Sequence, residues 1–121
     1  METTIFDWNA LPVEPTKTGE RRQFFQAPTA TLAELRCHAT TLNPGEASHA
    51  PHEHSDEELI IVKEGTITFL VDGEEKEVGA GSIIFQAPNE LHGMRNAGDV
   101  PVTYYVLRWI TPDMVDKPGE R

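Results

Sequence analysis

The sequence predicts an all-β protein built as a single domain. Its 121 residues suit one domain, and a chain of this size buries roughly two thirds of its unfolded surface without a disulfide. Nine glycines and nine prolines divide the chain into short segments, and none of these keeps a helical period over three turns. Short strands separated by turn signals are typical of a β-sandwich or β-barrel.

Six segments have the composition of strands, and each ends at a turn signal or a hairpin: 31–42, 58–65, 66–73, 74–81, 82–88 and 100–110. The first is followed by the turn signal NPG at 43–45, and the second ends at Gly65. Asp72-Gly73, between the third and the fourth, is typical of a two-residue hairpin turn. The last segment, VPVTYYVLRWI, is rich in the β-branched and aromatic residues that favour strands.

The chain on either side of the predicted domain, which spans 28–111, is rich in proline, glycine and charge. We expect residues 1–27 to form an N-terminal arm and residues 112–121 to form a C-terminal tail. Aromatic side chains in the arm suggest that it packs against another surface: Phe6, Trp8, Phe24 and Phe25.

Two apolar runs bear on assembly. LIIV in the second strand and IIF in the fifth do not alternate, whereas a strand with one wet face should. Both faces of these strands are therefore expected to be buried. Because the domain is small, either the N-terminal arm or a second protomer would cover the outer face, and we expect a homodimer.

Composition excludes several classes of function. The formal net charge of −10, from ten Lys and Arg against twenty Asp and Glu, opposes binding to nucleic acid or to an anionic membrane surface. Cys37 is the single cysteine, so no intrachain disulfide forms. There is no nucleophile elbow, phosphate-binding glycine loop or CxxC motif.

The expected location is cytoplasmic. No apolar run approaches the roughly 18 residues that a membrane helix needs. The N-terminus METTIFDWNA has neither the basic segment nor the apolar segment of a secretory signal. A chain from which an export signal had been removed would show the same features.

The segment HAPHEHSDEEL, at 49–59, holds three of the five histidines. His52 and His54 are two residues apart, so an extended backbone directs both side chains to one face. Glu58 lies four residues further on and shares their parity. If a hairpin brings His92 beside this segment, three imidazoles and one carboxylate converge. Mixed nitrogen and oxygen ligands suit Fe(II), Mn(II), Ni(II), Co(II) or Zn(II), and a solvated acidic loop is the alternative.

The neighbours of these residues are given other roles. His49 is interpreted as a loop histidine, and Glu57 competes with Glu58 for the ligand position, which parity assigns to Glu58. Glu53 and Asp56 are expected to face water.

A few residues outside this segment are expected in the core or around a cavity. Met94 shares the parity of His92 and should face inward, His38 is a weaker cavity candidate, and Cys37 is interpreted as a small core residue. Further residues could line a pocket: Ile60, Phe69, Gln86, Tyr104 and Arg108. An inward arginine among Arg36, Arg95 and Arg108 would favour an anionic substrate.

Two motifs in this sequence resemble those of the cupins, and the resemblance covers residues 31–110. The first comprises Gly45, the HEH at 52–54, Glu58 and Gly65, with an entry loop one residue longer than usual. The second lies in GSIIFQAPNELHGMRN, where Gly81, His92 and Asn96 are in register. Ala87 replaces the motif proline. Asn89 replaces the motif glycine, and asparagine also adopts a positive φ readily.

The resemblance implies a jelly-roll β-barrel that holds one divalent transition-metal ion through His52, His54, Glu58 and His92. It further implies a metalloenzyme of the oxygenase type that acts on a small organic molecule, with Glu58 also able to serve as a base. Two alternatives stay open, which are a non-redox isomerase, cyclase or lyase, and a non-catalytic module that binds a metal or a small ligand.

Overall fold

The computed structural model describes residues 1–49 and 51–114. Within them lie two 3-10 helices, η1 (Trp8–Ala10) and η2 (Pro112–Met114), and these strands: β1 (Glu14–Pro15), β2 (Gly19–Ala27), β3 (Glu34–Leu42), β4 (Glu57–Glu64), β5 (Thr66–Val71), β6 (Glu74–Gly79), β7 (Ile83–Gln86), β8 (His92–Arg95) and β9 (Val102–Ile110). None of the described helices has the length and apolar character needed to cross a membrane. Of the predicted C-terminal tail, residues 115–121 lie outside the described part.

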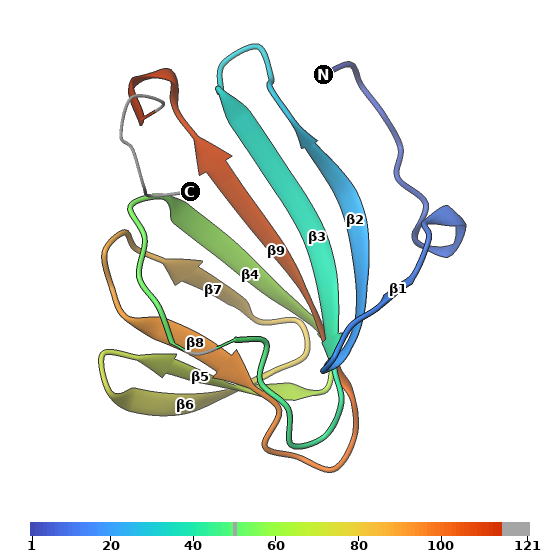
Figure 1. Cartoon of the computed structure of the whole chain (residues 1–121), viewed down its shortest axis with the longest axis vertical. Helices are drawn as coiled ribbons and strands as arrows, with labels where there is room; N and C mark the ends of the chain where they lie inside the picture. Colours follow the sequence, from blue (N-terminus) through green and yellow to red (C-terminus); the bar gives the residue numbers. More distant parts are fainter. Residues whose placement is uncertain (50, 115–121) are drawn as a thin grey trace.

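The strands form two antiparallel sheets, which confirms the all-β jelly-roll prediction. The larger sheet has the order β1-β2-β3-β9-β4-β7, and the smaller has the order β6-β5-β8 (Figure 1). The core lies between them and draws side chains from both sheets: Leu42, Ile60, Val62, Val102, Tyr104 and Val106 from the larger, and Ile67, Phe69 and Met94 from the smaller. Ile60 and Phe69, two of the side chains predicted to line a pocket, thus belong to this core.

All six predicted strands are present, with ends shifted by a few residues, but three described strands were not predicted: the short β1, and β2 and β8. β8 (His92–Arg95) pairs with β5, and β2 (Gly19–Ala27) pairs with β3 along its whole length. The region expected to be an N-terminal arm therefore contributes two strands, β1 and β2, to the larger sheet. β2 was not predicted because its sequence, GERRQFFQA, is charged. None of its residues is fully buried, so the strand does not need an apolar composition.

Ahead of β1, the chain packs on the outer face of its own sheet. The Phe6 ring lies 5.2 Å from that of Phe25, and the Trp8 ring lies 5.7 Å from that of Tyr105 on β9. Phe24 joins them at 5.7 Å from Tyr105. These centroid separations are in the range of favourable aromatic pairs. The expectation that the aromatic N-terminal segment packs on another surface is thus confirmed.

Two turns depend on backbone conformations with positive φ, which residues other than glycine rarely adopt. Asp72 and Gly73 have φ values of 46° and 85°, which form the predicted hairpin turn between β5 and β6. Gly65, with a φ of 78°, lies between β4 and β5, and a Cβ there would be 2.8 Å from the Pro101 carbonyl oxygen. Glycine is therefore required at 65 for both conformation and space.

The fifth predicted strand is not buried on both faces within one chain, contrary to expectation. In β7, the side chains of Ile83 and Phe85 are 63% and 56% exposed, and this strand is at the edge of the larger sheet. In β4, burial alternates: Ile60 and Val62 are buried, while Ile61 is only half-buried.

We expect a homodimer that covers the outer face of β7, and sedimentation velocity tests this. The wild type should sediment with the mass of two chains, and the double change Ile83→Ser with Phe85→Ser should shift it toward one, because it removes apolar surface that association would bury. Val100→Ser, at an exposed valine in the loop before β9, is the control and should leave the mass unchanged. A single-chain mass for the wild type at all concentrations would contradict the expectation.

Candidate metal centre

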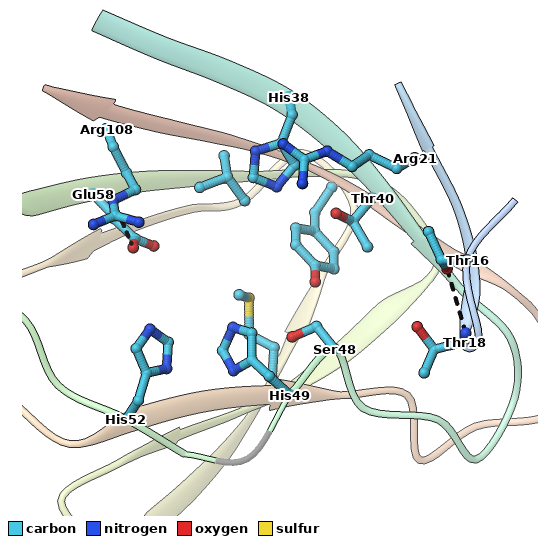
Figure 2. A pocket seen from close by; sticks show the side chains of 13 residues that line it. Thr16, Thr18, Arg21, His38, Thr40, Ser48, His49, His52, Glu58 and Arg108 are labelled. Atoms are coloured by element: carbon cyan, nitrogen blue, oxygen red, sulfur yellow. Dashed lines mark hydrogen bonds and ion pairs between the residues drawn. The ribbon is translucent and has the colours of Figure 1, made fainter. Parts of the chain in front are cut away.

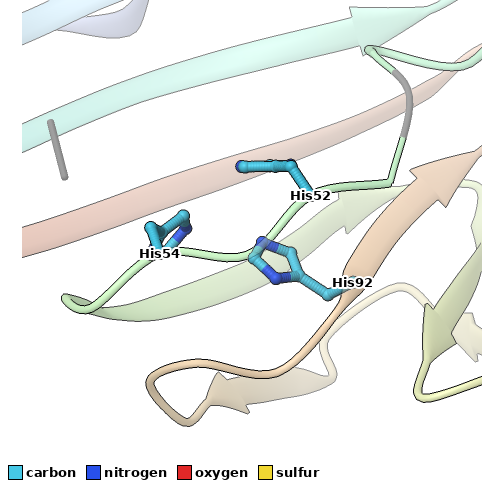
Figure 3. Close-up of side chains that lie close together, drawn as sticks. All are labelled: His52, His54 and His92. Carbon is cyan, nitrogen blue, oxygen red and sulfur yellow. The ribbon is translucent and has the colours of Figure 1, made fainter. Parts of the chain in front are cut away.

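Three histidines meet where the loop before β4 crosses the start of β8. His52 and His92 form an isolated antiparallel bridge, with His52 N donating to the His92 carbonyl at 3.0 Å and His92 N donating back at 2.9 Å. His54 follows two residues later on the same face. One ring nitrogen from each of the three lies within 4.8 Å of the others (Figure 3). The convergence that parity and a hairpin predicted is present.

Backbone carbonyls fix the orientation of two of these rings. His92 Nδ1 is 3.0 Å from the Glu90 carbonyl oxygen, and His54 Nδ1 is 3.0 Å from that of Asp56. A carbonyl only accepts, so Nδ1 is the donor in both rings, which leaves Nε2 as the nitrogen that could hold a metal ion. Metal-binding histidines are commonly held in this way.

Glu58 lies against the histidine cluster. Its side chain is 4% exposed, and its Oε2 is 2.7 Å from His54 Nε2. That nitrogen nevertheless has no hydrogen-bond partner, and the buried Nδ1 of His52 also has none. A carboxylate oxygen and an imidazole lone pair at this separation repel unless a proton or a metal ion lies between them. The donor set therefore fits a divalent ion held by His52, His54 and His92, and Glu58 as the fourth ligand stays a prediction.

Asp56 does not face water, contrary to expectation. It is 1% exposed, and its Oδ2 accepts from Arg108 Nε at 3.1 Å and from Nη2 at 2.7 Å. Its Oδ1 lies 3.0 Å from His54 Nδ1, so the carboxylate lies between the guanidinium and the ring. Asp56 has the same parity as His54 and Glu58, and this signal could have predicted an inward side chain.

Of the two other acidic residues, Glu53 faces water as expected, whereas Glu57, also expected to be solvated, does not. Glu53 is exposed. Glu57 is half-buried on the opposite face of β4, where its Oε1 accepts from Trp109 Nε1 at 3.1 Å. Glu57 is thus turned away from the histidines, in agreement with the parity argument.

Two asparagines of the second motif have structural roles. Asn96 is buried and donates from Nδ2 to the carbonyls of Leu42 and Val100, at 3.0 and 2.7 Å. Asn89 has a φ of 62°, as its replacement of a glycine suggested, and its N donates to the His54 carbonyl at 2.7 Å. The hydrogen bond from Asn89 to His54 links the segment before β8, which leads to His92, with the segment that holds His52 and His54.

A cavity of about 350 Å³ opens beside His52 and Glu58. Figure 2 shows Arg21, His38 and Thr40 on one side of it, with Ser48, His49 and His52 on the other. Met94, Tyr104 and Arg108 line it as predicted, and so does His38. The sequence missed Arg21, Thr16 and Thr18, which come from the segment predicted to be an arm.

The other candidates for the cavity lie elsewhere. Gln86 is buried and donates to the Ala87 carbonyl at 3.0 Å. Arg95 is ion-paired with Glu75, 2.6 Å away, on the surface. Arg36 is paired with Glu34 and lines a separate hollow that adjoins His38 and Arg108.

Several buried groups around the cavity are uncharged at neutral pH. Burial, together with the neighbouring imidazoles, lowers the pKa of His52 to about 4. Burial raises the pKa of Tyr104 to about 12, although the Ser48 and Thr40 hydroxyls offset part of the rise. On the other side of β3, burial raises the pKa of the Cys37 thiol to about 11, which suits a core residue rather than a nucleophile.

His38, which lines the cavity from β3, gives a test by pH. Burial, and then the charges of Arg21 and Arg108, lower the pKa of His38 to about 4. Above pH 6.5 His38 is neutral in the folded and unfolded states; as the pH falls toward 4, only the unfolded state gains the proton. We expect wild-type stability to fall by about 3 kcal/mol more than that of His38→Gln between pH 7 and pH 4. Urea unfolding of the metal-free proteins measures this, and parallel curves would contradict it.

The sequence and the fold were both compared with those of known proteins. A family model described as a cupin domain matches residues 38–108, which is more than half of the chain. The polyketide cyclase RemF from Streptomyces resistomycificus superposes with a TM-score of 0.75 at 21% identity, over 92% of this chain and 82% of that one.

Two further known structures superpose on this chain to a similar degree. An RmlC-like cupin from Shewanella frigidimarina gives a TM-score of 0.73 at 18% identity, over 93% of this chain and 95% of that one. A predicted oxalate decarboxylase from Thermotoga maritima gives 0.72 at 16% identity, over 88% and 99%. At these identities the likeness establishes the fold.

Proposed function

The chain belongs to the cupin family, and on that basis we propose that it is a metal-dependent protein that acts on a small organic molecule. The observation that carries the proposal is the pairing of His54 Nε2 with Glu58 Oε2, 2.7 Å apart and without a hydrogen bond, beside two further imidazoles. His52, His54 and His92 hold one divalent ion of iron, manganese, nickel, cobalt or zinc, and Glu58 is the fourth ligand.

The cavity suits an oxygenase-type reaction, which is the first candidate. A bound ion supplies Lewis acidity, and iron or manganese also supports chemistry with dioxygen. His52 and Glu58 line the cavity, so a small molecule within it reaches the ligand cluster directly. Glu58 is placed to accept a proton from that molecule. Met94 and Val106, from the two different sheets, provide apolar contact.

A non-redox reaction is the second candidate. The cyclase RemF has the same fold, and a Lewis-acidic ion can also assist an isomerase, a cyclase or a lyase. The polar wall of the cavity, which includes Tyr104 and Thr40, provides groups that orient oxygen atoms of a substrate. A non-catalytic module that binds a metal or a small ligand is the remaining alternative.

Reconstitution with different metals separates these reactions. Metal-free protein is loaded with Fe(II), Mn(II) or Zn(II) and incubated with a panel of small hydroxylated and carboxylated molecules. An oxygenase should consume oxygen in a substrate-dependent way with iron or manganese and not with zinc, which has no accessible redox change. A Lewis-acid enzyme should form the same product with zinc and without oxygen. Turnover by the metal-free protein would contradict metal dependence.

Glu58→Gln tests the role of the carboxylate. If Glu58 is a base, turnover should fall by roughly 100-fold or more while ligand affinity changes little, since general bases contribute rate rather than ground-state binding. Glu57→Gln, on the opposite face of β4, is the matched control and should turn over normally. Unchanged turnover in Glu58→Gln would exclude the base role.

A further inference from the structure

One wall of the cavity is formed by three neighbouring strands of the larger sheet. Arg21 on β2 is opposite Thr40 on β3, and Thr40 is opposite Tyr104 on β9, so these three side chains form one row across the sheet. Two residues along β3, His38 belongs to the next row on the same face. All four line the cavity, and Figure 2 shows Arg21, Thr40 and His38 on the side away from His52 and His49.

The guanidinium of Arg21 is the charge on this wall that no carboxylate balances. Arg108 is paired with Asp56, and Arg36, in the adjoining hollow, is paired with Glu34. Arg21 forms no ion pair within the described residues, and its Nη2 donates to the neutral Gln23 Oε1 at 2.8 Å. The remaining donors of its planar fork are available to a ligand.

The proposed metal centre, when it holds its ion, has the same positive sign of charge as Arg21. A divalent ion with three neutral imidazoles and the Glu58 carboxylate carries a net positive charge, and Arg21 adds another. Among the described residues that line the cavity, the carboxylate is that of Glu58, whose charge is already included in this sum. An anion therefore complements the cavity, although the chain as a whole carries a formal charge of −10.

Size and hydrogen-bonding groups narrow the class of anion. A volume of about 350 Å³ holds about a dozen non-hydrogen atoms, at about 30 Å³ for each water-sized group. Hydroxyls of Thr16, Thr18 and Thr40 line the end of the cavity near Arg21. A single unpaired guanidinium with neutral hydroxyls matches the single charge of a carboxylate, with its two coplanar acceptors, better than a phosphate dianion.

We propose that the ligand of this cavity is a small organic acid whose carboxylate binds Arg21. The rest of the molecule then extends toward His52 and Glu58, where the proposed function places the reaction. The proposal rests on that function for the identity of the reacting end and on Arg21 for the anchored end. It assigns a specificity role to β2 and the turn before it, which lie outside the residues matched by the family model.

Calorimetric titration of the zinc-loaded protein at neutral pH tests the proposal. The probes are lactate and benzoate, with lactamide and benzamide as neutral analogues of the same shape, and inorganic phosphate. We expect at least one acid to bind roughly tenfold or more tightly than its amide, as expected for hydrogen bonds to a charged group. Arg21→Gln should abolish this preference, and Arg21→Lys, which keeps the charge, should retain part of it.

Arg36→Gln is the matched control, because Arg36 is an ion-paired arginine on the next strand that does not line the cavity. It should keep the wild-type preference. Equal binding of acids and amides, a preference that survives in Arg21→Gln, or tighter binding of phosphate than of either acid would overturn the proposal. Zinc content is measured in every sample, so a wild type that fails to retain zinc contradicts the metal site, and a zinc-loaded protein without acid preference contradicts the carboxylate site.

Discussion

Replacing His92 by alanine is expected to lower the affinity for a divalent metal by more than about 100-fold, since loss even of a residue that supports a ligand costs 10–100-fold. His92 is 1% exposed, its ring is oriented by the Glu90 carbonyl, and its backbone is bonded to that of His52. No other described residue of β8 offers a nitrogen or carboxylate to the cluster. Competition against a chromophoric chelator measures the affinity.

His49→Ala is the control for this prediction. It removes an imidazole from the same loop, 4.2 Å from the His52 ring, without removing a predicted ligand. It should change the affinity far less than His92→Ala, while the double change His52→Ala with His54→Ala should match or exceed the loss. Circular dichroism checks that each variant stays folded. Wild-type affinity in His92→Ala would show that the ligands lie elsewhere.

The second large effect concerns the buried pair of Asp56 and Arg108. Asp56→Ala should reduce the free energy of unfolding by about 3 kcal/mol, because it removes the nearer carboxylate of the Arg108 guanidinium, 21% exposed, and leaves only Glu58, 3.6 Å from its Nε. The Arg108→Met change should be costly for the converse reason, since it leaves the carboxylate of Asp56 buried and unpaired. The double variant should cost less than the sum of the two, because neither charge is then left alone.

Urea unfolding of the metal-free proteins gives these free energies. Glu57→Ala is the neighbouring control, and it loses one hydrogen bond from Trp109 at a half-buried position, worth about 1 kcal/mol. If Asp56→Ala costs no more than Glu57→Ala, or if the two single changes are additive, the pair does not stabilise the fold in the way described.

Much of the fold could be predicted from local signals. The six strands at 31–42, 58–65, 66–73, 74–81, 82–88 and 100–110 were predictable because apolar composition and turn residues such as Asp72-Gly73 act within a few positions of each other. β2 and β8 escaped prediction because both lack that composition. Their pairing with β3 and β5 is a property of the sheet rather than of the segment.

The candidate site also contains some residues that local signals predicted and others that they could not predict. Parity and the resemblance to the cupins indicated that His52, His54 and His92 converge. Parity applied equally to Asp56, but the acidic character of SDEE favoured a solvated interpretation, and its partner Arg108 lies 52 residues away. Arg21 could not be predicted as part of the cavity, since it reaches the wall through pairing of β2 with β3. Non-local contacts of this kind leave no pattern within the segment itself.

One divalent ion per chain is the feature on which the proposed function depends. The most direct measurement is elemental analysis of untagged wild-type protein, as purified and after incubation with each of iron, manganese, nickel, cobalt and zinc followed by buffer exchange at neutral pH. The histidine cluster predicts stoichiometric retention of at least one of these ions, and its removal by a chelator should lower the melting temperature. Protein that retains none of the five ions would contradict a metal centre at His52, His54 and His92.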